Sequence, residues 1–334
     1  MSNRYSRQER FEGLGPGGQE RIGLGTVVVL GCGALGTLSS GLLVRAGVGR
    51  VRIVDRDIIE LHNLQRQHLF DEDDVALGLP KAVAAQRKLA VTNRDVVVEA
   101  TVADIGPANV LELIAGADVV VDGLDNFEAR LLVNDACLKL GIPWVYGGAV
   151  SAHGAVMVIR PGKTACFRCL VPGIPDGRLP TCETAGVLAS APTTVAAMQV
   201  VEALKLLAGV EDRISRDLVS MDLWHGGFTA IHIEPRSGCE ACAGTYEYLA
   251  RDIRGETEVM CSAVQVRPLA PRSLDLEQIA RQLDGLGEIL ANEHMLQFDG
   301  EGISFVLFPD GRAVVNETTD VSFARAVYSK YIGT

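Results

Sequence analysis

A β-branched run that ends in glycine and leads directly into a helix constrains this 334-residue chain more than any other feature. Residues 26–31 read Thr-Val-Val-Val-Leu-Gly, which is typical of a buried parallel strand. Gly31, Gly33 and Gly36 then form a Gly-x-Gly-x-x-Gly motif at the start of a helical pattern over 34–46. Such glycines permit a tight turn, close approach of a phosphate and close packing of helix on strand. The motif predicts a nucleotide site, although a glycine-rich turn that only packs would look similar.

Strand-like and helix-like segments continue to alternate after this motif, which predicts a doubly wound, Rossmann-like and mostly parallel α/β sheet. We expect further parallel strands at 50–55, 96–102, 117–122 and 143–147, with helices at 80–90, 126–140 and 191–208. Residues 148–160 have the pattern of an antiparallel extension after a turn, and two more strands are expected at 217–222 and 227–234. We therefore take residues 1–245 as one domain.

The remaining residues predict a smaller second part. Residues 246–260 are polar and lack a clear period, so we expect a linker there. Residues 261–334 predict a small α+β module, with strand-like stretches at 262–268, 287–297 and 303–316 and helices at 274–283 and 320–331. Residues 262–334 contain no cysteine, so this module lacks the cysteine loop of a rhodanese.

Charge and hydropathy exclude several classes of protein. The chain has 31 Lys+Arg against 42 Asp+Glu, a net charge of −11 that argues against nucleic-acid binding. We find no run of 18 apolar residues, so we expect no membrane span. Residues 1–13 lack the apolar core of a secretory signal. We therefore expect a cytoplasmic protein, in which thiols stay reduced.

Four of the eight cysteines form two Cys-x-x-Cys pairs, Cys166 with Cys169 and Cys239 with Cys242. Four thiolates complete a tetrahedral Zn²⁺ site, and such a closed site is structural. A pair of redox dithiols is the alternative. The long separation between the two pairs predicts a metal that ties distant segments together.

Cys182 stands alone in the loop-like sequence Thr-Cys-Glu-Thr-Ala-Gly-Val. An unpaired loop cysteine is a candidate nucleophile. From its spacing alone, an inert small residue is the favoured interpretation.

Asp55 ends the strand expected after the glycine motif, where an acid can bind ribose hydroxyls. NAD would be the usual ligand, but a dehydrogenase needs an apolar nicotinamide slot, and a charged stretch follows instead. That stretch contains Asp57, Asn63, Arg66, Gln67 and Lys81. Cations beside a bound triphosphate can neutralise the charge that develops on the α-phosphate and the departing pyrophosphate. A solvated charged loop remains an equal alternative for Arg66.

Asp122 and Asp125 stand at the end of another expected strand. Strand carboxyl ends line the ligand crevice of open α/β sheets, and a carboxylate beside a nucleotide is a natural Mg²⁺ ligand. Helix capping by Asp125 or Asn126 is equally compatible with the local sequence.

Together these residues resemble the ThiF/MoeB/HesA family, the bacterial relatives of ubiquitin-activating enzymes. The resemblance covers about residues 4–245 and includes Arg4-Tyr-Ser-Arg-Gln8, Asn63-Leu-Gln-Arg-Gln67, Leu79-Pro-Lys81, Leu124-Asp-Asn126, both cysteine pairs and the sequence around Cys182. It implies an adenylyltransferase that uses MgATP to activate the C-terminal glycine of a ubiquitin-like sulfur carrier protein ending in Gly-Gly. The acyl-adenylate then accepts sulfur and becomes a thiocarboxylate.

The same resemblance implies roles for individual residues. Asp55 would hold the ribose, and Asp125 would serve Mg²⁺ and the reacting centre. Arg7 would reach across an obligatory homodimer into the partner's ATP site, and Cys182 would stand where ThiF-type members handle sulfur. The phosphates would be contacted by Asn63, Arg66, Gln67 and Lys81.

The C-terminal sequence is similar to the extension of some Gram-positive-type ThiF proteins, on 259–266 and 308–315 above all. This similarity favours a ThiS-like carrier and thiamin thiazole synthesis, with sulfur from a separate donor such as a cysteine desulfurase. The same chemistry on a MoaD-like carrier in molybdopterin synthesis, or in another thiocarboxylate pathway, is the alternative. Two hypotheses are more remote: an NAD-dependent oxidoreductase, and a non-catalytic interaction module that zinc stabilises.

Overall fold

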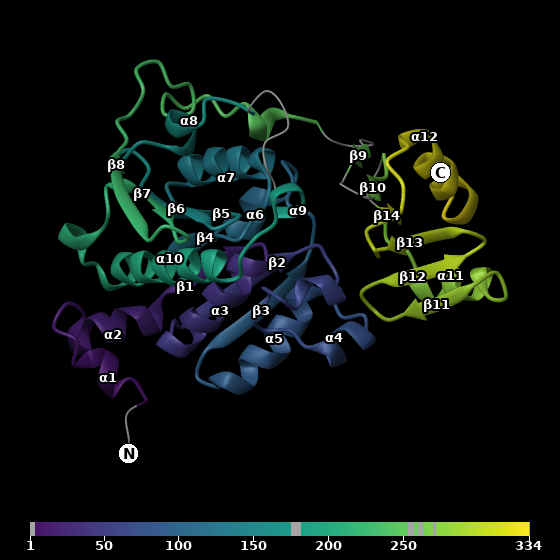
Figure 1. The fold of residues 1–334 in the computed structure, drawn as a ribbon, viewed down its shortest axis with the longest axis horizontal. Coiled ribbons are helices and arrows are strands. Elements are labelled where there is room, and N and C mark those ends of the chain that lie inside the picture. The colour runs from purple at the N-terminus through teal and green to yellow at the C-terminus, as the bar shows by residue number, and fades with distance from the viewer. Residues whose placement is uncertain (1–3, 175–181, 253–256, 260–262, 270–271, 334) are drawn as a thin grey trace. The chain divides into compact units, whose positions relative to one another are not determined.

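The computed structural model describes residues 4–174, 182–252, 257–259, 263–269 and 272–333 (Figure 1). The chain divides into two compact units, Met1–Arg251 and Asp252–Thr334. None of the described helices is long and apolar enough to cross a membrane.

The first unit is built on an eight-stranded sheet with the order β3-β2-β1-β4-β5-β6-β7-β8. Strands β1 to β5 pair in parallel, and β6, β7 and β8 extend the sheet in antiparallel fashion, as expected from the sequence. The bounds are β1 Thr26–Leu30, β2 Arg50–Asp55, β3 Val97–Val102, β4 Val119–Asp122, β5 Trp144–Val150, β6 His153–Ile159, β7 Asp217–Asp222 and β8 Gly227–His232. The doubly wound α/β fold is therefore confirmed.

Helices cover both faces of this sheet, which explains why β1 is apolar at successive positions. Val27 and Val29 pack into one core beside α3, α5 and α10, and Val28 and Leu30 pack into another beside α6 and α7. The helices are α1 Ser6–Glu9, α2 Gly15–Leu24, α3 Ala34–Ala46, α4 Glu72–Ala76, α5 Lys81–Thr92, α6 Val110–Ile114, α7 Phe127–Leu140, α8 Phe167–Leu170, α9 Cys182–Ala185 and α10 Ser190–Ala208, with short 3-10 turns η1 Leu61–Asn63, η2 Glu211–Arg213 and η3 Tyr248–Ala250.

The second unit is an antiparallel sheet with the order β11-β12-β13-β14-β10-β9 and two helices. Phe298, Phe305 and Tyr331 form its aromatic centre, with the two phenylalanine ring centroids 5.2 Å apart. Its elements are β9 Thr257–Val259, β10 Ala263–Val266, α11 Leu276–Leu283, β11 Glu288–Ala291, β12 Leu296–Gly300, β13 Ile303–Leu307, β14 Ala313–Asn316 and α12 Val321–Tyr331. This is the α+β module expected from the sequence.

Residues 246–260, expected as a linker, contribute elements to both units. Tyr248 is buried in the first unit, where its backbone N–H donates to Asp135 Oδ2 at 2.9 Å. Strand β9 pairs with β10 as the edge of the second sheet. Both contacts are long-range or cross-strand pairings, which a polar local sequence does not reveal.

The glycine motif forms the turn between β1 and α3. Gly31 has a φ of +91°, which favours glycine. A Cβ at Gly36 would lie 1.9 Å from the carbonyl oxygen of Gly31, whereas a Cβ at Gly33 would meet nothing closer than Gln67 Nε2, at 3.9 Å. The turn lies where the chain order reverses between β1 and β4, the usual ligand crevice of such sheets.

These distances predict opposite outcomes for two substitutions in one motif. Gly36→Ala should lower the free energy of unfolding by about 2 kcal/mol or more, because the backbone must move to admit the methyl group. Gly33→Ala should cost about 1 kcal/mol or less. Urea unfolding followed by circular dichroism compares the two variants. Equal stability of both would contradict the close packing of α3 on β1.

Candidate functional site

Asp55 is held beneath the glycine turn. Its Oδ2 accepts a hydrogen bond from the backbone N–H of Cys32 at 2.5 Å, and its Oδ1 accepts one from Asp57 at 2.7 Å. Burial, and then the neighbouring charge of Asp57, raise the pKa of Asp55 to about 6, against the lowering effect of Lys81 and the two backbone donors. The carboxyl group is therefore fixed in place at the end of β2.

Lys81 is the cation next to this acid. Its Nζ donates to Asp57 Oδ2 at 2.9 Å, and its backbone N–H donates to the Asp57 carbonyl at the same distance. Burial acts to lower the pKa of Lys81, but Asp57 and Asp55 outweigh it and the net pKa is raised. A buried lysine thus stays charged at the first residue of α5.

The loop after β2 adds two buried amides. Asn63 and Gln67 are 4% and 3% exposed, and Asn63 Oδ1 accepts from the Glu60 backbone N–H at 3.2 Å. Gln67 Oε1 is buried without a hydrogen-bond partner among the described residues, and its amide nitrogen faces Gly33. A bound ligand or an ordered water molecule would satisfy this acceptor beside the glycine turn.

Arg66 does not reach this cluster directly. Its Nη1 donates to the carbonyl oxygen of His62 at 3.0 Å, within its own loop. The sequence offered a solvated loop as an alternative for Arg66, and the partly exposed side chain is compatible with either role.

The two aspartates after β4 have different environments. Asp122 is fully buried, with Oδ1 accepting from the Leu124 N–H at 2.8 Å and Oδ2 accepting from Arg130 Nε at 3.0 Å. Burial raises the pKa of Asp122, and Arg130 opposes this rise. Each oxygen accepts a hydrogen bond from within the protein, so Asp122 stabilises the loop after β4.

Asp125 is exposed, and its negative charge contributes to the raised pKa of Lys81. Asn126 caps α7, because its Oδ1 accepts the Ala129 N–H at 2.8 Å. The capping role considered for either residue thus falls to Asn126. Asp125 lies just after the end of β4, close enough to Lys81 for its charge to act on that side chain. Arg130, which the sequence analysis missed, connects Asp122 to this loop.

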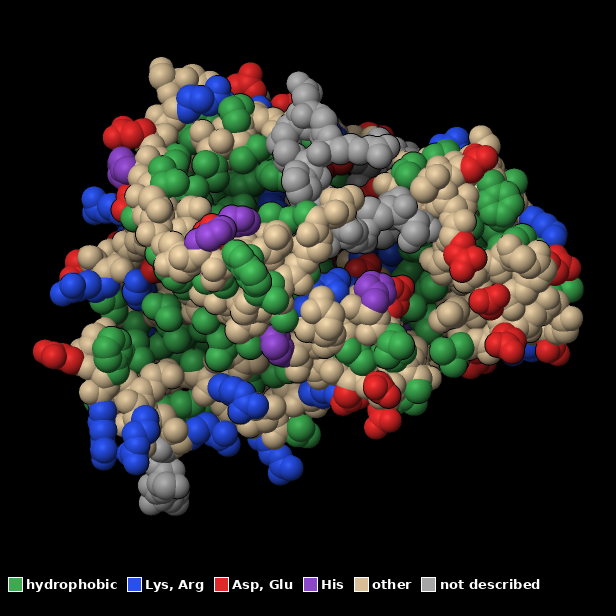
Figure 2. Space-filling model, viewed as in Figure 1, with side chains coloured by type: hydrophobic (Ala, Val, Ile, Leu, Met, Phe, Trp, Pro, Cys, Tyr) green, Lys and Arg blue, Asp and Glu red, His purple; other side chains and the backbone are tan. Residues whose placement is uncertain are grey.

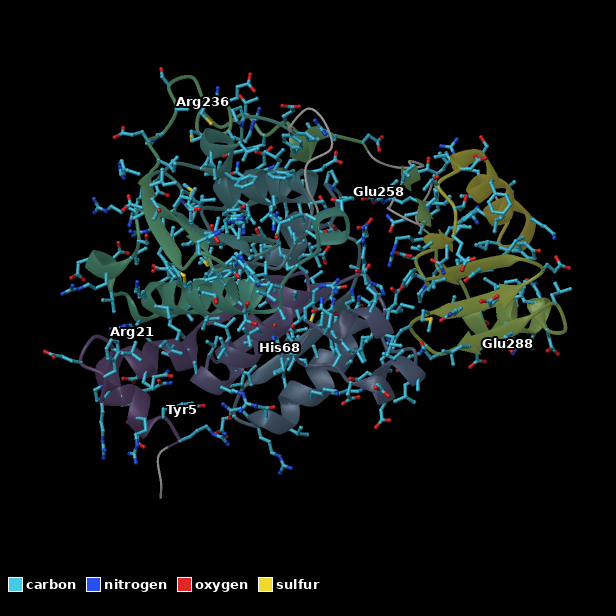
Figure 3. All side chains as sticks on the ribbon, viewed as in Figure 1. Tyr5, Arg21, His68, Arg236, Glu258 and Glu288 are labelled. Carbon is cyan, nitrogen blue, oxygen red and sulfur yellow. The ribbon has the colours of Figure 1, made fainter. Side chains whose placement is uncertain are left out.

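Arg7 lies far from the cluster of Asp55 and Lys81. Its helix α1 is anchored where α3 and α5 end: Gln8 Nε2 donates to the Ala46 carbonyl at 3.0 Å, and the Tyr5 hydroxyl accepts from Asn93 Nδ2 at 2.8 Å. Figure 3 labels Tyr5 on this segment, and Figure 2 shows Lys and Arg side chains along this edge.

The lengths of α3 and α5 measure that separation. The glycine turn precedes the first residue of α3, and Lys81 is the first residue of α5. The segment from Arg4 to Gln8, by contrast, contacts the last turn of each helix. At 1.5 Å per residue these helices are roughly 20 Å and 18 Å long. The exposed Arg7 therefore lies near the ends of the strands opposite to those that carry Asp55 and the glycine turn of its own chain.

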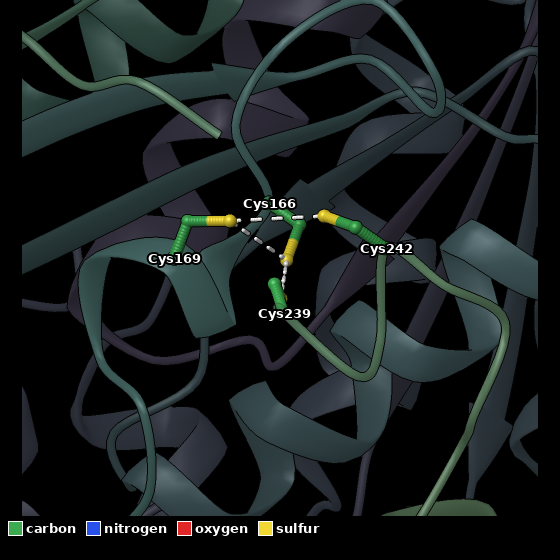
Figure 4. Close-up of side chains that lie close together, drawn as sticks. All are labelled: Cys166, Cys169, Cys239 and Cys242. Atoms are coloured by element: carbon green, nitrogen blue, oxygen red, sulfur yellow. Dashed lines mark hydrogen bonds between the residues drawn. The ribbon is translucent and has the colours of Figure 1, made fainter. Parts of the chain in front are cut away.

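The four cysteines of the two Cys-x-x-Cys pairs converge (Figure 4). Their sulfur atoms lie within 4.8 Å of one another, and three of the separations are 3.6, 3.7 and 3.8 Å. A tetrahedral zinc ion with Zn–S bonds of about 2.3 Å requires sulfurs about 3.8 Å apart. The donor set and its spacing therefore fit zinc, which would link α8 to the segment after β8.

Neighbouring residues support this arrangement. The backbone N–H of Arg236 donates to Cys169 Sγ at 3.3 Å. Arg168, buried between the first two cysteines, pairs with Glu240 at 3.1 Å and Glu247 at 3.2 Å on the other segment. Salt bridges and cysteines thus join the same two stretches of chain.

Comparison with known proteins agrees with the motifs. The sequence profile of the ThiF family matches residues 5–241. The chain belongs to the ThiF family. This ThiF-family chain is 43% identical, over all of both chains, to the sulfur carrier protein ThiS adenylyltransferase of Bacillus subtilis. It is 34% identical to the Escherichia coli protein of that name, over 72% of this chain and 95% of the relative. The resemblance recognised in the sequence is confirmed.

Other similarities cover about three quarters of this ThiF-family chain. MOCS3 of Xenopus laevis, an adenylyltransferase and sulfurtransferase, is 35% identical over 73% of this chain and 54% of the relative. A crystal structure of E. coli MccB superposes with a TM-score of 0.64 at 26% identity, covering 72% of this chain and 74% of that one.

The remaining cysteines of the ThiF-family chain divide into two groups. Cys32 and Cys137 are fully buried, and burial above all raises the pKa of each thiol, as suits packing residues. Cys182 begins α9, but its side chain lies outside what the structure describes, and so does Cys261.

Zinc removal should destabilise the first unit, because the metal joins two distant segments. Stripping the metal with a chelator should lower Tm by roughly 10 °C. The Cys242→Ser variant should have the lower Tm of the metal-free protein before any chelator is added. Adding the chelator should not lower its Tm further. Calorimetry with metal analysis makes the comparison. Metal-free protein that kept its full Tm would point to redox dithiols instead.

Proposed function

We propose that this chain uses ATP and Mg²⁺ to adenylylate the C-terminal glycine of a ubiquitin-like sulfur carrier protein ending in Gly-Gly. The observation that carries the proposal is the cluster of Asp55, Asp57 and Lys81 beside the glycine turn, at the point where the sheet order reverses. The 43% identity to a ThiS adenylyltransferase over the whole chain, second unit included, supports it. A solved structure of MccB with ATP supports the choice of nucleotide.

The carrier would be ThiS-like, in thiamin thiazole synthesis. Relatives named for ThiS support this choice. The MOCS3 relatives favour the alternative, a MoaD-like carrier in molybdopterin synthesis or another thiocarboxylate pathway, but the chain spans about half the length of those proteins. Sulfur would come from a separate donor such as a cysteine desulfurase, and Cys182 would handle it.

The residues of this chain position two anions and screen their repulsion. Asp55 would hold the ribose, and the open backbone at Gly33 with the start of α3 would receive phosphate oxygens. Asn63, Gln67 and Lys81 would contact the phosphates, and Arg66 would join them by leaving its bond to the His62 carbonyl. The carboxylate of the carrier attacks the α-phosphorus, and pyrophosphate leaves.

Mg²⁺ suits the donors at the end of β4. Asp125 offers an exposed carboxylate, the hard oxygen ligand that Mg²⁺ prefers beside phosphates. Bound there, the ion would neutralise charge on the phosphates. Asp122 would keep its structural role, since both of its oxygens are occupied.

A homodimer would complete the site. Arg7 lies roughly 20 Å from the glycine turn of its own chain, so it would act in the site of a second copy. The outer surface of α3 and α10 also carries apolar side chains, with Val201 52% exposed and Leu38, Leu42 and Met198 partly exposed. Such a face suits contact with a second copy.

ATP–pyrophosphate exchange tests the reaction and the carrier together. Exchange should appear with a carrier ending in Gly-Gly and should identify the pathway by its preference between ThiS-like and MoaD-like carriers. Arg66→Ala and Asp125→Ala should each reduce it by about 100-fold or more, because each removes charge stabilisation, without lowering Tm. The exposed Lys139→Ala serves as the control. Near-normal exchange by either site variant would count against the assignment.

Mixed dimers test the trans role of Arg7. Arg7→Ala and Asp125→Ala chains, each inactive alone, should regain about a quarter of wild-type exchange when mixed equally and allowed to trade subunits. Half of the dimers would then contain one intact site. If Arg7 acted within its own chain, mixing would restore nothing, and the dimer proposal would fail.

A further inference from the structure

Arg130 makes more contacts than a counterion for Asp122 needs. It lies in the first turns of α7 and is 7% exposed. Its Nε donates to Asp122 Oδ2 at 3.0 Å, and its Nη2 donates to the carbonyl oxygens of Leu124 at 2.5 Å and Gly147 at 2.9 Å. One planar guanidinium thus binds the carboxylate, the loop after β4 and strand β5.

These contacts occur where the strands separate. Regular pairing of β4 with β5 ends at Val121 and Val145. Beyond that point side chains bridge the two strands. Gln199 Nε2 donates to the carbonyls of Asp122 at 2.9 Å and Val145 at 3.0 Å. Arg130 then links the Leu124 carbonyl to the Gly147 carbonyl. The sheet remains joined across the opening through side chains.

The loop that Arg130 holds also carries Asp125. On one side of Asp125, the Leu124 carbonyl is fixed by Arg130 and the Leu124 N–H by Asp122. On the other side, Asn126 is fixed as the cap of α7. Asp125 thus projects from a short segment that is anchored at both ends.

We propose that Arg130 is a positioning residue for adenylyl transfer, which holds the Asp125 carboxylate at the metal and phosphates by bracing the loop after β4. The inference rests on the role proposed above for Asp125. A bare counterion would need only Asp122, but two of the three bonds go to carbonyl oxygens that flank the opening.

Arg130→Lys separates bracing from charge. Lysine keeps the ion pair with Asp122 but lacks the planar fork that reaches the two carbonyls. The kcat of carrier-dependent exchange should fall about 10- to 100-fold, with the KM for the carrier changed less than about 3-fold. The affinity for Mn²⁺·ATP, measured by electron paramagnetic resonance without a carrier, should fall about 5-fold or more.

Arg160→Lys is the matched control. Arg160 directly follows β6, is 9% exposed and forms an ion pair with Glu211. Neither residue belongs to the proposed site. Arg160→Lys should lower the Tm by about as much as Arg130→Lys does. It should leave the affinity for Mn²⁺·ATP and the kcat unchanged. If Arg130→Lys lost activity only in step with this control, Arg130 would be merely structural.

A double-mutant cycle with Asp125→Asn decides the route of action. If Arg130 acts through Asp125, Arg130→Lys should have no further effect on Mn²⁺·ATP affinity once Asp125 is neutral. Additive effects would overturn the inference. Should Arg130→Lys fail to fold, the neutral pair Arg130→Gln with Asp122→Asn replaces it in the same cycle.

The Mn²⁺·ATP readout also separates this inference from the proposed function. Binding that follows the expected pattern, without exchange on any carrier, would refute the carrier assignment and leave the role of Arg130 standing. Wild-type protein that binds no Mn²⁺·ATP would overturn both.

Discussion

The close approach of two backbone segments at the crossover between β1 and β4 governs the arrangement of the site. A Cβ at Gly31 would lie 2.4 Å from the carbonyl oxygen of Gly123, and the reverse contact is equally short. The two loops that leave β1 and β4 therefore start side by side. One opens into α3 and leaves backbone accessible at Gly33, and the other brings Asp125 to the same edge. Larger residues at either glycine would push the glycine turn away from the loop that carries Asp125.

Around this contact, buried charges are arranged in two clusters with different tasks. Asp55, Asp57 and Lys81 form a connected cluster in which Lys81 keeps its charge because two carboxylates face it. Asp122 and Arg130 form a separate ion pair with its hydrogen bonds directed to backbone. Breaking a buried pair leaves an uncompensated charge, so each member is sensitive to loss of the other. The first cluster suits a ligand, and the second suits a scaffold.

Local patterns predicted the elements that local forces determine. The β-branched run of β1, the helical spacing of α3 and the Cys-x-x-Cys pairs all carry their signal within a few residues, and the structure agrees with each. Roles that depend on distant partners were invisible. Arg130 donates to the carbonyl of Gly147 in β5, and the buried Tyr248 donates to Asp135, 113 positions away. The sequence placed Asp122 and Asp125 alike at one strand end. Only burial and hydrogen bonding separate the scaffold residue from the exposed one.

The cysteine cluster joins residues 73 positions apart, from Cys166 to Cys239. The enclosed stretch contains α10, which packs on the sheet, and the hairpin of β7 and β8, whose outer strand is exposed at every residue. A crosslink over so long a loop removes much of the freedom of the unfolded chain. Zinc bound there would also hold the segment after β8 to α8, which would keep this exposed edge strand from pairing with other chains. The supply of zinc would then affect aggregation as well as thermal stability, because newly made chains without zinc would be prone to aggregate.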